Sequence, residues 1–190
     1  MIFTSKSRKE KPERERERDI YIYIGVLIKL IDAMLLFFFL VVILAAPAFD
    51  AQVCFPSKFF PNFLVDLNLW FTSEYGDYLL IEKPSFFVGL MWLELLFQWP
   101  LANVNLYAIL VGGKPWFNST CLVYGVFVFT GMVAVLAELI LSSRITNVLM
   151  MMYLPFLGFA ILAILRGLLP CSRHTKMNTR VPALGRKKRA

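Results

Sequence analysis

One carboxylate, Glu94, lies inside a long apolar run of the sequence. The run extends from Phe86 to Pro100, and almost every other residue in it favours hydrocarbon over water. A charge at bilayer depth costs about 2.5 kcal/mol or more, so such an acid normally faces a bundle interior or a ligand cavity. Gln98 follows four residues later and would share its helical face. The pattern favours a functional site within a membrane, and the alternative is a protonated Glu94 that only hydrogen-bonds a neighbouring helix.

Four apolar runs are long enough to position such a site across a bilayer. They cover residues 28–49, 86–111, 121–141 and 148–169, and about 20 apolar residues cross the hydrocarbon core. Backbone polar groups in lipid must be satisfied within their own segment, so all four runs are predicted to be helices. The composition agrees, because 58% of the 190 residues are hydrophobic. We predict an all-α membrane protein built as a bundle of four transmembrane helices.

The charged residues gather at the two ends of the chain, which has a net charge of +7. Of the 20 basic residues, seven precede Asp19 and eight lie at or after Arg166, whereas residues 50–83 are mainly acidic. Basic flanks favour the cytoplasmic side, so we expect both termini in the cytoplasm and the acidic connection on the lumenal or exoplasmic side. The basic residues indicate membrane flanks, and we expect no nucleic-acid partner.

The cysteines and the glycosylation motif predict no covalent modification. The three cysteines fall in separate regions and form neither a disulfide framework nor a metal site; they are Cys54, Cys121 and Cys171. The motif that begins at Asn118 lies between the second and third spans, on the cytoplasmic side in this topology, so we expect it to be unglycosylated. The sequence carries no phosphate-binding loop, and we expect no cofactor.

The two ends of the chain are predicted to lie outside the folded domain. Within residues 1–27, Glu alternates with Arg over residues 13–18 and Ile alternates with Tyr over residues 20–24, as in translated dinucleotide repeats. We therefore assign residues 1–27 no fold and consider an upstream start in the gene. The small residues at 45–48 leave open a cleaved first span. Residues 170–190 form a basic cytoplasmic tail, in which Lys187 and Lys188 match the dilysine signal for retrieval to the endoplasmic reticulum.

The connection between the first two spans is rich in aromatic residues. We expect it to fold back onto the membrane interface or to cap the bundle, because aromatic rings favour that zone. Pro100 predicts a bend in the second helix. Lys29 and Asp32 lie three residues apart at the start of the first span, so they are placed to pair on one helical face.

Two stretches of the sequence carry a resemblance to a known family. They run from Trp70 to Leu80 and from Trp92 to Pro100, and Asp50 closes the first span before them. Together they resemble the sigma-2 receptor family, also called the transmembrane protein 97 family, of the EXPERA-domain group that includes the emopamil-binding protein sterol isomerases. The resemblance implies an EXPERA transmembrane domain over residues 28–169. It also implies a multi-pass protein of the endoplasmic reticulum membrane with a lipophilic pocket, open to the bilayer, for sterols and cationic amphiphiles.

The resemblance also implies roles for individual residues. Asp50 would pair with the ammonium group of a ligand, and Glu94 would be its close partner in the pocket. Asp77 would brace the pocket through hydrogen bonds. The other residues that the resemblance places in or behind the pocket are Gln98, Trp70, Tyr75, Tyr124 and Tyr153. The chain departs from the family pattern at Phe156, Met152 and Gly131, which puts ligand preference in question.

Two carboxylates close together in a low dielectric cannot both ionise cheaply, so Asp50 and Glu94 should share one proton. The pair would carry about one negative charge, which suits one ammonium framed by aromatic faces. A neutral sterol could instead use the pair as hydrogen-bond partners for its hydroxyl group.

Two other functions stay open. Paired acids could also catalyse sterol double-bond isomerisation. The isomerases resembled here use an intramembrane histidine as well, whereas His174 of this chain lies in the tail. A third alternative is a membrane chaperone or scaffold that meets a protein partner in sterol trafficking and needs no pocket. A homodimer is suggested by the family alone.

Overall fold

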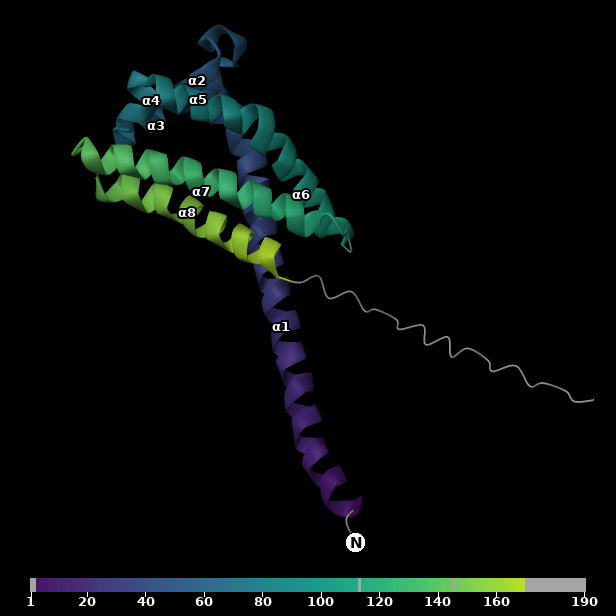
Figure 1. Ribbon diagram of the computed structural model, residues 1–190. Coiled ribbons are helices and arrows are strands. Elements are labelled where there is room, and N and C mark those ends of the chain that lie inside the picture. The colour runs from purple at the N-terminus through teal and green to yellow at the C-terminus, as the bar shows by residue number, and fades with distance from the viewer. Residues whose placement is uncertain (1–2, 113, 145, 170–190) are drawn as a thin grey trace, which may run out of the picture.

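The structure is almost entirely helical (Figure 1). It is a computed structural model that describes residues 3–112, 114–144 and 146–169, with side chains from residue 15 onward, and no β-strand occurs in those ranges. Four helical segments are long and apolar enough to cross a membrane: Glu15–Cys54, Ser85–Val111, Phe117–Leu141 and Asn147–Leu168. The predicted all-α bundle of four transmembrane helices is therefore confirmed.

Short elements interrupt and connect these segments. In chain order the elements are α1 (Phe3–Ala45), the π-helix η1 (Ala46–Asp50), α2 (Ala51–Cys54), the 3₁₀-helix η2 (Ser57–Phe59), α3 (Asn62–Tyr75), α4 (Tyr78–Glu82), α5 (Ser85–Leu93), the π-helix η3 (Glu94–Gln98), α6 (Trp99–Val111), α7 (Phe117–Leu141) and α8 (Asn147–Leu168). The first membrane segment thus joins α1, η1 and α2, and the second joins α5, η3 and α6. The basic tail with Lys187 and Lys188 lies outside the described residues.

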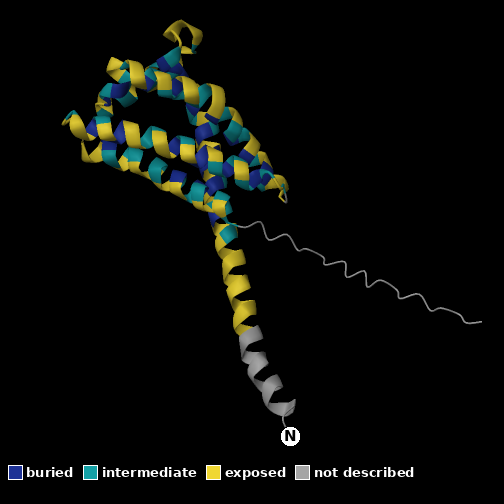
Figure 2. Ribbon diagram, in the orientation of Figure 1, coloured by how far each residue is buried: buried dark blue, intermediate teal, exposed yellow. Residues whose placement is uncertain are grey.

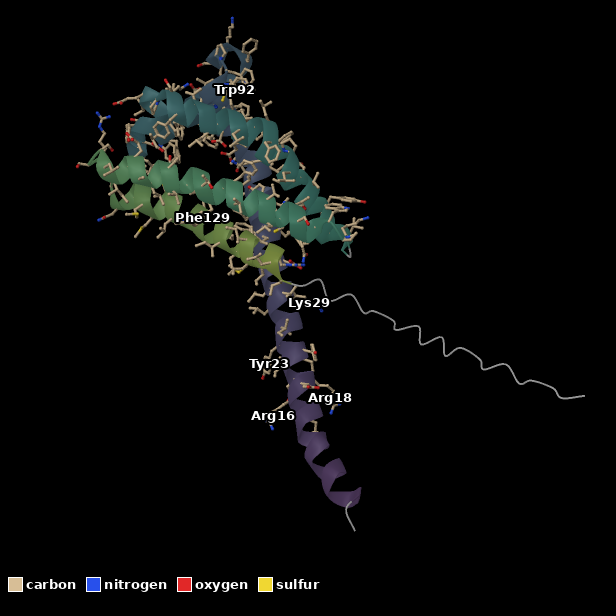
Figure 3. The ribbon with its side chains drawn as sticks, in the orientation of Figure 1. Arg16, Arg18, Tyr23, Lys29, Trp92 and Phe129 are labelled. Carbon is tan, nitrogen blue, oxygen red and sulfur yellow. The ribbon has the colours of Figure 1, made fainter. Side chains whose placement is uncertain are left out.

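The amino-terminal part of α1 extends away from the bundle as a single helix (Figure 1). Its side chains are exposed from Glu15 to Leu30, with Ile28 alone partly covered (Figure 2). Arg16, Arg18 and Tyr23 project from it away from the bundle (Figure 3). This differs from our expectation of no fold over residues 1–27. Glu and Arg are strong helix formers, and Glu15 and Arg18 approach to 3.8 Å across one turn. The helix there depends on local propensity and not on packing.

Helices α7 and α8 form a tightly packed hairpin, and Figure 1 shows them side by side. Two glycines allow this approach. A Cβ atom at Gly125 would lie 2.8 Å from the backbone nitrogen of Ile164. A Cβ atom at Gly167 would lie 2.7 Å from the carbonyl oxygen of Asn118. Small residues at such positions bring helix backbones together, which is the main source of helix association in lipid.

Helix α1 crosses this hairpin and joins the bundle through its second half. Leu35 and Phe39 are fully buried, and the Phe39 ring meets the edge of Tyr124 with centroids 5.0 Å apart. Helix α6 covers α1 from another side, where the indole nitrogen of Trp99 donates to the carbonyl oxygen of Ile43 at 3.1 Å. Aromatic contacts and one hydrogen bond therefore fix α1 against three other helices.

A polar cluster, which we call the Arg166 clamp, ties α1, α7 and α8 at one end of the bundle. Arg166 donates from Nε and Nη2 to the two carboxylate oxygens of Asp32, and from Nη1 to Asn118 at 3.0 Å. The Asn118 amide then donates to the carbonyl oxygen of Leu169 at 2.6 Å. The prediction that Asp32 pairs with Lys29 was wrong. The guanidinium of Arg166 can donate to both carboxylate oxygens of Asp32 at once, whereas an ammonium acts as a single point charge.

The Arg166 clamp should stabilise the fold more than an exposed ion pair does. We expect Arg166→Ala to lower the free energy of unfolding by about 2 kcal/mol, because Asp32 would be left without its cation. The side chain of Asp32 is 25% exposed and that of Arg166 is 11% exposed. The control is Arg144→Ala, whose partner Glu82 is 56% exposed, so that loss should stay below about 1 kcal/mol. Unfolding in detergent micelles measures both, and equal losses would contradict the prediction.

Candidate ligand-binding site

A cavity of about 370 Å³ lies inside the bundle. Its walls come from α1 with η1, from α5 with η3, and from α7 and α8, while α3 and α4 each contribute one residue and Asp77 precedes α4. The lining is mostly apolar with a few polar groups, as is usual for small-molecule sites. The apolar lining residues are Phe38, Val42, Ala45, Phe49, Phe71, Leu80, Phe87, Leu90, Met91, Val128, Gly131, Met132, Val135, Met152 and Phe156, and the polar ones are Asp50, Asp77, Glu94, Gln98, Tyr124 and Tyr153.

Two of the three carboxylates that line the cavity, Asp50 and Glu94, lie on π-helical turns. Asp50 ends η1, which contains Pro47 near its start, and Glu94 begins η3, which is followed by Pro100. The two π-helices contact each other, and both acids line the same cavity. A π-turn inserts an extra residue into a helical turn and is frequent at functional sites. Here it gives each acid a position that a regular helix would not provide.

Neither carboxylate has a protein partner among the described residues. No hydrogen bond or ion pair from that part of the chain reaches the side chain of Asp50 or Glu94. No Lys, Arg or His is present among the lining residues of the cavity. A lone charge in such surroundings is costly, and it is retained only where a proton, a cation or a hydrogen-bond donor compensates it. The free carboxylate oxygens can therefore accept hydrogen bonds or pair with a cation.

Asp77 is held by the protein itself. One carboxylate oxygen caps α4 by accepting from the backbone nitrogen of Leu79 at 3.1 Å, and the other accepts from the hydroxyl group of Tyr153. The residue is 1% exposed. Asp77 therefore connects the short helix α4 to α8 and has little capacity left for a ligand, in contrast to Asp50 and Glu94.

Two more predicted site residues line the cavity, and two do not. Gln98 and Tyr124 are buried in the lining. Trp70 is 56% exposed and packs on Tyr75, with centroids 6.1 Å apart. Tyr75 in turn contacts Phe71, with centroids 4.8 Å apart. The structure thus places Trp70 and Tyr75 behind Phe71, which is the ring of this group that reaches the cavity.

Sequence reasoning missed most of the apolar lining. Phe87 and Leu90 lie in a run in which nearly every residue is apolar, so no pattern distinguishes the side that faces the cavity. Phe71 lies among several aromatic residues of the connection, and nothing in the sequence separates it from Trp70 or Tyr75. The three positions that depart from the family pattern, Gly131, Met152 and Phe156, do line the cavity. Within the described ranges, no group of three His, Cys, Asp or Glu side chains is placed to hold a metal ion.

The hydrogen bond between Tyr153 and Asp77 should stabilise the contact between α4 and α8 beside the cavity. We expect Tyr153→Phe to lower the free energy of unfolding by about 1 to 3 kcal/mol, because the buried carboxylate of Asp77 would lose its side-chain donor. The matched control is Tyr75→Phe, since the Tyr75 hydroxyl makes no hydrogen bond within the described part of the chain. Thermal unfolding in detergent compares the two variants. A loss for Tyr75→Phe as large as that for Tyr153→Phe would refute the assignment.

Comparison with known proteins places the chain in a family. The model of the EXPERA family (EXPanded EBP superfamily) matches residues 63–167, more than half of the chain. The protein named Sigma intracellular receptor 2 of Xenopus tropicalis is 27% identical over 115 residues, which cover 60% of this chain and 67% of that protein. Its namesake of Homo sapiens is 29% identical over 94 residues, which cover 50% of this chain and 53% of that protein. The matches thus span between half and two thirds of the relatives' length. The chain belongs to the EXPERA family of multi-pass membrane proteins.

Proposed function

We propose that this protein is a membrane receptor that binds sterols and cationic amphiphiles in the cavity between its helices. The observation that carries the proposal is the pair of carboxylates, Asp50 and Glu94, which line the cavity without a partner among the described residues. The similarity to proteins named Sigma intracellular receptor 2 supports a sterol-related membrane receptor in general.

The chemistry of the cavity suits one positive group with an apolar body. Asp50 and Glu94 share one proton and together carry about one negative charge. An ammonium group between them supplies the counter-charge. The rings of Phe49 and Phe71, whose centroids are 5.8 Å apart, offer aromatic faces to the cation and to its substituents. A neutral sterol uses the same pair, since a protonated acid donates to its hydroxyl oxygen and the carboxylate accepts from its hydroxyl proton.

An apolar hollow between α1 and α8 supports access from the bilayer. Its volume is about 250 Å³, and it is lined by apolar residues alone: Phe37, Phe38, Val41, Met152, Pro155, Phe156 and Phe159. Three of these, Phe38, Met152 and Phe156, also line the cavity. A lipophilic ligand that is dissolved in the membrane would therefore reach the acid pair without passing through water.

We propose binding without turnover. Isomerisation of a sterol double bond needs one group that protonates the olefin and another that removes a proton. Asp50 and Glu94 form such a pair, which is the observation in favour of an isomerase. The lining has no histidine, and His174 lies outside the described residues. An isomerase assay on membranes separates the two functions.

Location and partners complete the proposal. We place the protein in the endoplasmic reticulum membrane with both termini in the cytoplasm, on the strength of the basic flanks and of Lys187 and Lys188. The Asp77 side of the bundle then faces the lumen, and the Arg166 clamp faces the cytoplasm. A protein partner in sterol trafficking and a homodimer are further parts of the proposal, supported by the family alone.

Substitution of the acids tests the binding site. We expect Asp50→Asn and Glu94→Gln to weaken binding of a radiolabelled cationic amphiphile by about thirtyfold or more, because loss of a desolvated charge partner costs about 2 kcal/mol or more. The control is Asp66→Asn, whose carboxylate is exposed on α3. Saturation binding to membranes, with sterol as competitor and thermal unfolding as a check on folding, provides the measurement. Unchanged affinity in a folded Asp50→Asn variant would exclude the proposed site.

A further inference from the structure

Gly131 differs from Gly125 and Gly167, the two glycines at the contact between α7 and α8. Gly125 and Gly167 lie where the two helices touch, and a Cβ atom at either would collide with backbone of the facing helix. A Cβ atom at Gly131 would meet only the end of the Leu90 side chain, at 4.0 Å, which is an ordinary contact. Close helix packing therefore explains the first two glycines and does not explain Gly131.

Gly131 faces the cavity instead. It lines the cavity together with Val128 and Val135, which precede and follow it by about one turn on the same side of α7. The missing side chain leaves a notch between the two valines. A glycine within a helix costs about 0.5 to 1 kcal/mol relative to alanine, so the notch is maintained against local propensity.

The notch lies beside the acid pair. Leu90, the neighbour of Gly131, precedes Glu94 by one helical turn, and both side chains line the cavity. The rings of Phe97 and Phe127, whose centroids are 4.8 Å apart, place the next turns of η3 and α7 against each other. A ligand held by Asp50 and Glu94 therefore presents to Gly131 the part of its body next to its polar group.

We infer that Gly131 is a specificity-determining residue, which keeps the cavity wide beside the acid pair and admits ligands that carry a rigid ring system directly on the polar group. This inference rests on the proposed function. A ring fused next to the ammonium or hydroxyl carbon fills the notch. A straight alkyl chain of the same length leaves it empty and gains nothing from it.

Two tertiary amines that differ in width test the inference. Dimethylaminocholestane has its nitrogen on a rigid ring, and N,N-dimethyloctadecylamine has its nitrogen on a straight chain. We expect Gly131→Leu to lower the affinity for the cholestane amine at least about tenfold, because the added side chain overpacks the site. The affinity for the linear amine should change by less than about threefold. Gly158→Leu is the control, because a Cβ atom at Gly158 meets nothing within 4 Å and the residue is not among those that line the cavity. It should leave both affinities within about threefold.

The outcomes separate this inference from the proposed function. Equal weakening of both amines by Gly131→Leu, or no weakening of either, overturns the role of Gly131. If the wild-type protein binds neither amine, the receptor proposal fails, and thermal unfolding still tests the notch. Gly131→Ala should then unfold at the same or a higher temperature than wild type, whereas Gly125→Ala unfolds lower. A loss of stability for Gly131→Ala as large as that for Gly125→Ala overturns the notch as well.

Discussion

The desolvation of two neighbouring carboxylates is the constraint on which the rest of the structure depends. Asp50 and Glu94 lie inside a bundle whose other cavity groups are mostly apolar. No Lys, Arg or His of the described residues lines the cavity with them. Arg166 is held by Asp32 at another place in the bundle, and the third acid of the cavity, Asp77, is bonded to Tyr153. Within the described part of the chain the pair therefore has no cation beside it, and its oxygens stay open toward the cavity.

Part of this arrangement could be predicted from the sequence because the signal is local. One carboxylate in an apolar run is conspicuous, and hydropathy alone separates the four spans. The partner of Glu94 could not be predicted in this way, because Asp50 lies at the end of a span, where an acidic residue is common. Its assignment needed the resemblance to a family. The π-turns escaped prediction, because a change of hydrogen-bond register within a helix has no residue signature beyond the nearby prolines.

Other features depend on neighbours that no local pattern reveals. Trp70, Tyr75 and Phe71 have similar chemistry, yet only Phe71 reaches the cavity, because the orientation of α3 over the bundle decides which ring turns inward. The Arg166 clamp joins residues far apart in the chain, so the nearby Lys29 was the wrong choice for Asp32. The extended part of α1 shows the opposite case, in which strong local propensity gives a helix without any packing.

The close contact at Gly125 and Gly167 has a mechanical consequence. Separating α7 from α8 would break contacts along two whole helices, so this hairpin forms a stiff wall. The opposite wall contains two π-turns flanked by prolines, where helices bend at modest cost. Expansion around a guest molecule is therefore concentrated in the hinges at η1 and η3. These hinges carry Asp50 and Glu94, so any swelling of the cavity also changes the spacing of its two charges.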